Sequence, residues 1–141
     1  IQTKSESILT VGQAEWDRVF QINVWAVMAL CQAFAPGMRA RGYGRIINLT
    51  SGIADQPNLA VYSVSKAAVD KYSRDLAAEF KGENVLVNFL DPGWLQTDLG
   101  GKNAMYPVED ALPGALVPAL LDDNGPTGRF FAAQDFRYLE R

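Results

Sequence analysis

Hydrophobic positions follow helical spacing in two long stretches of the chain. Across residues 10–41, one face carries apolar residues three or four positions apart, namely Trp16, Val19, Phe20, Val24, Val27, Leu30, Cys31 and Phe34. Across residues 60–81, the same spacing places four apolar residues on one side, namely Val69, Tyr72, Leu76 and Phe80. Thr10 and Gln13 fit a capping box before the first stretch, and Gly82 follows the second, where helices often end. The pattern therefore predicts two amphipathic helices.

Short runs of β-branched and apolar residues alternate with these helices. Residues 45–50 (RIINLT) and 85–90 (VLVNFL) lie between turn-forming residues and predict two strands. Residues 128–132 predict a third strand, and 108–121 predict a third helix that two prolines weaken. Two strand–helix–strand units in series favour parallel pairing. We therefore expect an α/β fold, a Rossmann-like doubly wound parallel sheet with about three strands and three helices.

The chain has 141 residues and a mass of 15.5 kDa, which corresponds to one domain. Three parallel strands make a small sheet, and no glycine-rich phosphate-binding turn precedes them. We therefore interpret residues 1–141 as a single partial domain, the carboxyl-terminal portion of a Rossmann-type domain.

Composition excludes several kinds of chemistry. The net charge is −3, which argues against nucleic-acid binding and against binding to an anionic membrane surface. No apolar run approaches the roughly 18 residues of a membrane span, and no signal peptide is recognisable, so we expect a cytoplasmic protein. The chain has no histidine and one cysteine, Cys31, which excludes an intramolecular disulfide, a Cys/His zinc site, a Ser-His-Asp triad and a Cys-His dyad. We expect no metal site.

Tyr62 and Lys66 form the arrangement with the clearest chemical potential. Residues four apart share one face of a helix, with Cβ atoms about 5–6 Å apart. At an effective dielectric of about 20, a charge about 5 Å away is worth roughly 3 kcal/mol, or about two pKa units. Lys66 could therefore lower the pKa of Tyr62 from about 10 towards 8. Ser51 ends the preceding strand, so all three side chains are predicted to meet at the carboxyl edge of the sheet.

The same segment allows a different interpretation. Ser63 and Lys66 have the Ser-x-x-Lys spacing of the nucleophile and lysine in penicillin-binding proteins and related hydrolases. The chain contains neither Ser-Asp-Asn nor Lys-Thr-Gly, and the α/β pattern around the motif differs from that class. A Ser-x-x-Lys hydrolase therefore remains a remote alternative.

Four motifs in the correct order resemble the short-chain dehydrogenase/reductase family. They are Asn23 in QINVWAV, GRIINLTS ending at Ser51, YSVSK from Tyr62 to Lys66, and VNFLDPGWLQT ending at Thr97. The tail DDNGPTGRFF is similar to carbonyl-reductase-like members in particular. The resemblance runs from about residue 10 to residue 131, and it implies an oxidoreductase that interconverts a carbonyl and an alcohol with a nicotinamide cofactor.

The resemblance also implies roles for individual residues. Tyr62 would be the general acid in reduction and the base in oxidation, and Lys66 would lower its pKa and bind the nicotinamide ribose. Ser51 would hydrogen-bond the substrate oxygen, and Asn23 would bend its helix and hold a water that links Lys66 to solvent. The remaining cofactor contacts would come from residues after the second strand, namely Pro92, Gly93, Leu95 and Thr97. The family's glycine-rich turn is not among residues 1–141.

The resemblance further implies a small-molecule substrate, NADP or NAD as cofactor, and a homodimer or homotetramer. The carbonyl-reductase-like tail slightly favours NADP. A non-catalytic alternative stays open, in which this partial domain serves only as a dimerisation module. Small residues suited to close helix packing support that alternative, namely Ala26, Ala29, Ala33, Ala67, Ala68, Ala77 and Ala78.

Overall fold

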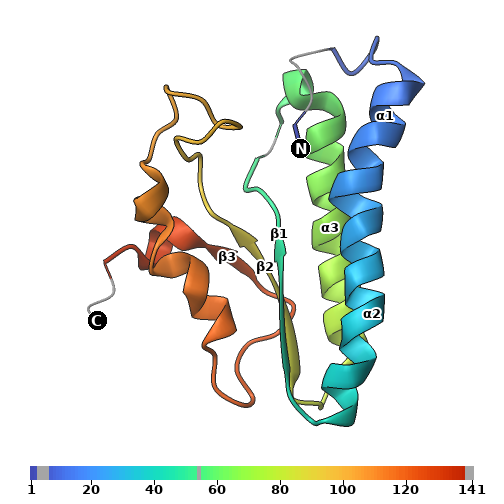
Figure 1. Ribbon diagram of the computed structural model, residues 1–141, viewed down its shortest axis with the longest axis vertical. Helices are drawn as coiled ribbons and strands as arrows, with labels where there is room; N and C mark the ends of the chain where they lie inside the picture. The colour runs from blue at the N-terminus through green and yellow to red at the C-terminus, as the bar shows by residue number, and fades with distance from the viewer. Residues whose placement is uncertain (3–6, 54, 139–141) are drawn as a thin grey trace.

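Three parallel strands form the centre of the molecule. The computed structural model describes residues 1–2, 7–53 and 55–138, and its sheet has the order β1-β2-β3 (Figure 1). The strands are β1 (Gly44–Leu49), β2 (Val85–Asp91) and β3 (Phe130–Ala132). Gly44 pairs with Val85 at one end of the β1–β2 register. The predicted α/β class and parallel pairing are therefore confirmed.

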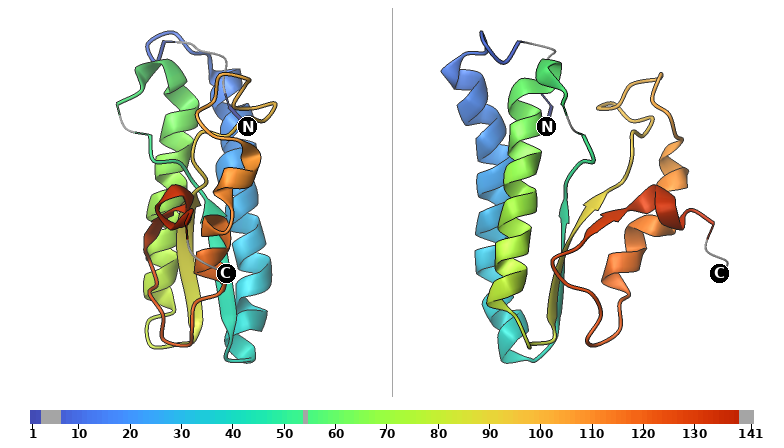
Figure 2. Two further views of the ribbon diagram at one scale, coloured as in Figure 1. Left: turned by 90° about the vertical axis from the view of Figure 1, so that its left-hand side faces the viewer. Right: turned by 180° about the vertical axis from the view of Figure 1, so that it is seen from behind.

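Two long helical runs lie side by side on one face of this sheet (Figures 1 and 2). The first consists of α1 (Gln13–Phe20), the π-helical turn η1 (Gln21–Trp25) and α2 (Ala26–Ala40). The second is α3 (Ala60–Glu79). Both predicted helices are confirmed, with ends that lie within three residues of the predicted ones.

The start and end of the first helical run differ in how well the sequence predicted them. At the end, the Gly42 N–H donates to the Arg39 carbonyl and the Tyr43 N–H to the Met38 carbonyl, at 3.1 and 3.2 Å. Gly42 has φ +68°, so this is a Schellman motif that favours glycine. At the start, the predicted capping box is wrong. The helix begins after Gly12 without a side-chain cap, and the Thr10 hydroxyl instead donates backwards to the Ser7 carbonyl.

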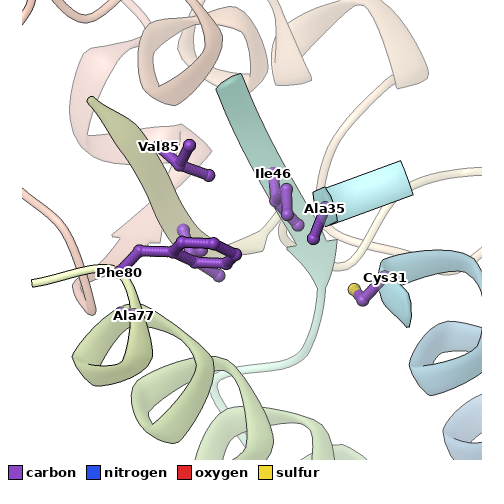
Figure 3. Close-up of a cluster of buried hydrophobic side chains, with 7 residues drawn as sticks. Cys31, Ala35, Ile46, Ala77, Phe80 and Val85 are labelled. Carbon is purple, nitrogen blue, oxygen red and sulfur yellow. The ribbon is translucent and has the colours of Figure 1, made fainter. Parts of the chain in front are cut away.

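The main hydrophobic core lies between the two helical runs and the sheet. Its buried members come from both layers, and Figure 3 shows them packed together: Cys31, Ala35, Ile46, Ala77, Phe80, Val85 and Val87. Ala77, one of the small residues considered for a dimer contact, is thus part of this chain's own core. β2 is buried along almost its whole length, as expected for a central strand that is covered on both faces.

The opposite face of the sheet is covered by short, irregular elements. The predicted helix over 108–121 is wrong, because that segment forms two 3₁₀ turns, η3 (Val108–Ala111) and η4 (Gly114–Ala119). Pro113 separates the two turns and Pro118 lies inside the second, and neither residue can donate the backbone hydrogen bond that an α-helix needs. A third 3₁₀ turn, η5 (Ala133–Phe136), follows β3.

The run from Gln13 to Ala40 also bears on the membrane prediction. An 18-residue window within it reaches a mean hydropathy of 1.4, so by length and composition alone it could cross a membrane. The sequence-based statement that no segment approaches a span was therefore too strong. In the structure this run packs along α3 and β1, and 28% of the apolar window is buried.

Candidate active site

Tyr62 and Lys66 lie in the first turns of α3, on the same side of the helix as predicted. The Lys66 Nζ atom lies 5.7 Å from the centroid of the Tyr62 ring. Ser51 follows the end of β1, and it lies close enough to Tyr62 to lower the pKa of that side chain. The structure therefore brings together the three side chains that the sequence predicted to meet at the carboxyl end of β1.

The electrostatics of Tyr62 differ from the expectation. Burial raises the pKa of Tyr62 above its usual value, and the negative charge of Asp91 raises it further, while the hydrogen bond from Ser51 opposes both. The expected lowering of this pKa by Lys66 is not found. Lys66 instead directs its ammonium group to the Leu49 carbonyl, to which Nζ donates at 3.0 Å. Tyr62 therefore holds its proton at neutral pH in this arrangement.

Lys66 is half-buried, and burial lowers its pKa, while the nearby carboxylate of Asp70 opposes that shift. Its ammonium group carries three donors, and the hydrogen bond to the Leu49 carbonyl uses one. Lys66 also borders an open apolar groove of about 420 Å³ between β1 and α2. The group is thus placed to donate hydrogen bonds to a further polar ligand.

Asn23 lies in the π-helical turn and is buried, with 5% of its surface exposed. Its amide nitrogen donates to the Ser65 hydroxyl at 3.0 Å, and that hydroxyl donates to the Tyr62 carbonyl at 2.7 Å. The same amide contacts Ile1, whose amino group donates to Asn23 Oδ1 at 2.7 Å. Asn23 therefore connects the first helical run to the turn of α3 that carries Tyr62. The helical run is π-helical at this residue, from Gln21 to Trp25, and the bend expected at Asn23 stays a prediction.

Pro92 and Gly93 form the turn that follows β2. Gly93 has φ +87°, which favours glycine, and the Gln134 amide donates to the Pro92 carbonyl at 3.0 Å. Leu95 and Thr97 lie further along the same segment. The Thr97 hydroxyl accepts a hydrogen bond from the Gly100 N–H at 3.1 Å. Because β1 and β2 are parallel, this turn lies at the same sheet edge as Ser51. The hydrogen bonds of Thr97 stay within its own loop.

A comparison with known families identifies this arrangement. The family model described as short chain dehydrogenase matches residues 2–105. This chain belongs to the short chain dehydrogenase family. The match includes Asn23, Ser51, Tyr62, Lys66 and the segment that follows β2.

Two curated relatives show how similar the chain is to other members of the short chain dehydrogenase family. The 2-keto-3-deoxy-L-fuconate dehydrogenase of Xanthomonas campestris pv. campestris is 43% identical over 99 residues, which cover 68% of this chain and 33% of that protein. The C-signal protein of Myxococcus xanthus is 31% identical over 131 residues, which cover 88% of this chain and 78% of that protein. The chain thus spans one third of the first relative and most of the second.

The fold is also similar to solved structures, of which this chain covers only a part. A gluconate 5-dehydrogenase from Burkholderia cenocepacia, solved in complex with NADP and tartrate, superimposes with a TM-score of 0.78. It is 24% identical, and the match covers 94% of this chain and 59% of that one. This likeness shows that the chain forms part of a Rossmann-type fold.

Sequence reasoning missed two acidic residues next to this site. Asp70 lies one turn beyond Lys66, and its carboxylate accepts a hydrogen bond from the Thr50 hydroxyl. Asp91 ends β2, and its carboxylate contacts two loops. The spacing of four from Lys66 could have indicated Asp70. The sequence places Asp91 at the carboxyl end of a predicted strand and so at the same sheet edge, but its contact with the loop after Ser51 depends on the β1–β2 pairing.

Proposed function

We propose that this chain carries the catalytic portion of an NAD(P)-dependent reductase, which interconverts a carbonyl and an alcohol by hydride transfer. The observation that carries the proposal is that Ser51, close enough to Tyr62 to act on its pKa, and the Lys66 ammonium group beside the Tyr62 ring lie together. A phenol, a hydroxyl and an ammonium group at the carboxyl edge of a parallel sheet suit a substrate whose oxygen gains negative charge. Membership of the short chain dehydrogenase family supports the same reaction class.

The residues at this edge fit a nicotinamide cofactor. Lys66 has donors to spare for a ribose hydroxyl, and the glycine at 93 keeps the turn after β2 free of a side chain. A Cβ atom on Gly93 would lie 3.1 Å from Gln134, so a larger residue would disturb this turn. Pro92, Gly93, Leu95 and Thr97 would line the cofactor under this proposal. When bound, the cofactor supplies the hydride, and the residues of the chain position the substrate and donate the proton.

The proposed roles follow from the raised pKa of Tyr62. Because its pKa is raised, Tyr62 carries its proton at neutral pH and donates it to the carbonyl oxygen during reduction. The Ser51 hydroxyl donates a hydrogen bond to the same oxygen. Asn23, through Ser65, holds the turn of α3 that positions Tyr62. In alcohol oxidation Tyr62 must instead lose its proton, so oxidation should become faster as the pH rises.

The rest of the cofactor needs residues beyond 1–141. Within the described residues, β1 pairs only with β2 (Figure 2). The apolar groove is lined by residues of β1 on one side and of the first helical run on the other. An amino-terminal segment that adds parallel strands beside β1 would fill the groove and supply the phosphate-binding turn. The solved relative is consistent with such a segment, since this chain covers 59% of it.

NADP is proposed ahead of NAD, supported by the carbonyl-reductase-like tail and by the NADP found in the solved relative. A homodimer or homotetramer is proposed as well. Its support is the exposed large side chain of Trp25 on the first helical run, which lies outside that groove. A cytoplasmic location remains a prediction.

The test combines the intact mass of the natural protein with fluorescence titrations using NADPH and NADH, and with turnover of a panel of ketones. We expect a mass above 15.5 kDa, tighter binding of NADPH, and a fall in turnover of at least about a thousandfold in Tyr62→Phe. Cofactor affinity should change little in that variant. Retained turnover would refute the role of Tyr62. A mass of 15.5 kDa without nucleotide binding would favour the dimerisation module.

A further inference from the structure

Asp91, the last residue of β2, joins two loops that both belong to the candidate site. Its Oδ2 atom accepts a hydrogen bond from the Gly52 N–H at 2.9 Å, and its Oδ1 atom accepts one from the Gly93 N–H at 2.9 Å. Gly52 directly follows Ser51, and Gly93 belongs to the turn proposed to line the cofactor. One carboxylate therefore spans the substrate side and the cofactor side of the site.

Asp91 packs so closely against Gly52 that position 52 has no room for a side chain. A Cβ atom on Gly52 would lie 2.7 Å from Asp91 Oδ2, which is closer than real Cβ contacts come. The Thr50 N–H donates to the Leu90 carbonyl at 2.8 Å, so β1 and β2 are still paired immediately before the two loops begin. Hydrogen bonds from backbone N–H groups to a carboxylate are charge-assisted and roughly twice as strong as neutral ones. Asp91 thus continues the strand pairing into the loops.

We propose that Asp91 is a positioning residue, which holds the Ser51 loop and the Pro92–Gly93 turn at a fixed separation so that substrate and cofactor meet at Tyr62. This role rests on the proposed reductase function. Asp91 lies within the motif VNFLDPGWLQT, but neither the roles that the resemblance implies nor the Tyr-x-x-x-Lys spacing involves its side chain.

The charge of Asp91 has a second effect on the site. The groups that act on Tyr62 or lie beside it are Ser51, Lys66 next to the ring, and Asp91 from the end of β2. Asp70 lies further along α3, bound to Thr50 and close enough to Lys66 to act on its pKa. Because the negative charge of Asp91 raises the pKa of Tyr62, removing that charge should lower it.

The first experiment uses the unmodified protein, labelled with ¹⁵N, and follows the amide resonances of Gly52 and Gly93 during acidification. If one carboxylate accepts both bonds, both resonances move together, with a single midpoint, as the pH falls. Independent movement of the two resonances, or no movement, overturns the proposal. This measurement needs neither turnover nor a variant that folds.

The second experiment measures the ionisation of Tyr62 by ¹³C-tyrosine NMR, with Tyr62→Phe to assign the signal. In Asp91→Asn, the pKa of Tyr62 should fall, because a negative charge that raises it is removed. Asp75→Asn is the matched control, because it removes the same charge from an exposed position on α3 and should leave Tyr62 unchanged. Equal shifts in the two variants, or no shift in either, would contradict the role of the Asp91 charge.

A third variant, Gly52→Ala, keeps the charge but crowds the contact. In the natural protein it should lower kcat about tenfold without moving the pH profile. Asp91→Asn should lower kcat and also move the profile to lower pH. If Gly52→Ala leaves kcat unchanged, the loop contact has no positioning role. Absence of cofactor binding in the unmodified protein would instead refute the proposed function. The two NMR experiments would still test the contacts and the charge of Asp91, because they do not depend on turnover.

Discussion

The two faces of the sheet are covered in different ways. One face carries two long helical runs that share a buried core with β1 and β2. The other carries short 3₁₀ turns and loops around a smaller cluster of Leu90, Phe131 and Ala133. Tyr62 and Lys66 owe their separation to the regular repeat of a helix on the first face. Beyond β2, positions depend on individual contacts, such as those of Gln134 with the Pro92 carbonyl.

The largest stability difference between the faces should come from removing one phenylalanine from each. Phe80, on the helical face, is 4% exposed within the larger core, and Phe80→Ala should lower the free energy of unfolding by about 3–5 kcal/mol. Phe131→Ala, on the other face, should cost at least about 1 kcal/mol less, because the smaller cluster leaves a cavity that relaxes more easily. Urea denaturation measures both. Equal losses would mean that the two faces stabilise the domain equally.

The same substitution should have opposite signs on the two faces. Gly37 lies inside α2, where a Cβ atom meets nothing closer than 3.7 Å, so Gly37→Ala should stabilise the protein by about 0.5–1 kcal/mol. Gly114 lies in η4, where a Cβ atom would be 1.9 Å from the Ala133 carbonyl oxygen. Gly114→Ala should therefore destabilise it by about 1–3 kcal/mol. Thermal unfolding of both variants decides the point, and a stabilised Gly114→Ala would contradict the close contact.

The smallest expected effect concerns alkaline pH on the helical face. Burial, with smaller effects from Cys31, raises the pKa of Tyr72 to about 12. Ionising Tyr72 is therefore harder in the folded state than in the unfolded state. Its contribution to stability is complete below pH 10 and is lost as the pH rises towards about 12. Since Tyr72 is partly exposed, solvent screening limits the loss to about 1 kcal/mol.

Tyr72→Phe should remove this part of the alkaline loss. The comparison is urea denaturation at pH 9 and pH 11, with Tyr138→Phe as the control, because Tyr138 is 84% exposed. If both variants lose the same stability between the two pH values, burial of Tyr72 does not contribute to the alkaline sensitivity.

Sequence reasoning was most successful where a periodic pattern and a local rule agreed. Spacing alone predicted both long helices and placed Tyr62 and Lys66 on the same face of one of them. Strand patterning located β1 and β2 to within a residue. It was wrong for 108–121, where the apolar spacing is helical but the prolines remove backbone donors. It was also wrong for Thr10, because a capping box predicts a contact that the chain replaces with a backward bond to Ser7.

The sequence by itself determined the α/β class, the order of the elements and the identity of the Ser51, Tyr62 and Lys66 group, because these follow from short-range periodicity and from motif order. Only the tertiary structure decided the charge around Tyr62. The raised pKa of Tyr62 results from burial and from Asp91, a residue that is 29 positions away in the sequence and close only because β1 and β2 pair. Desolvation and through-space charge depend on distances that the strand pairing sets, and no local pattern encodes them.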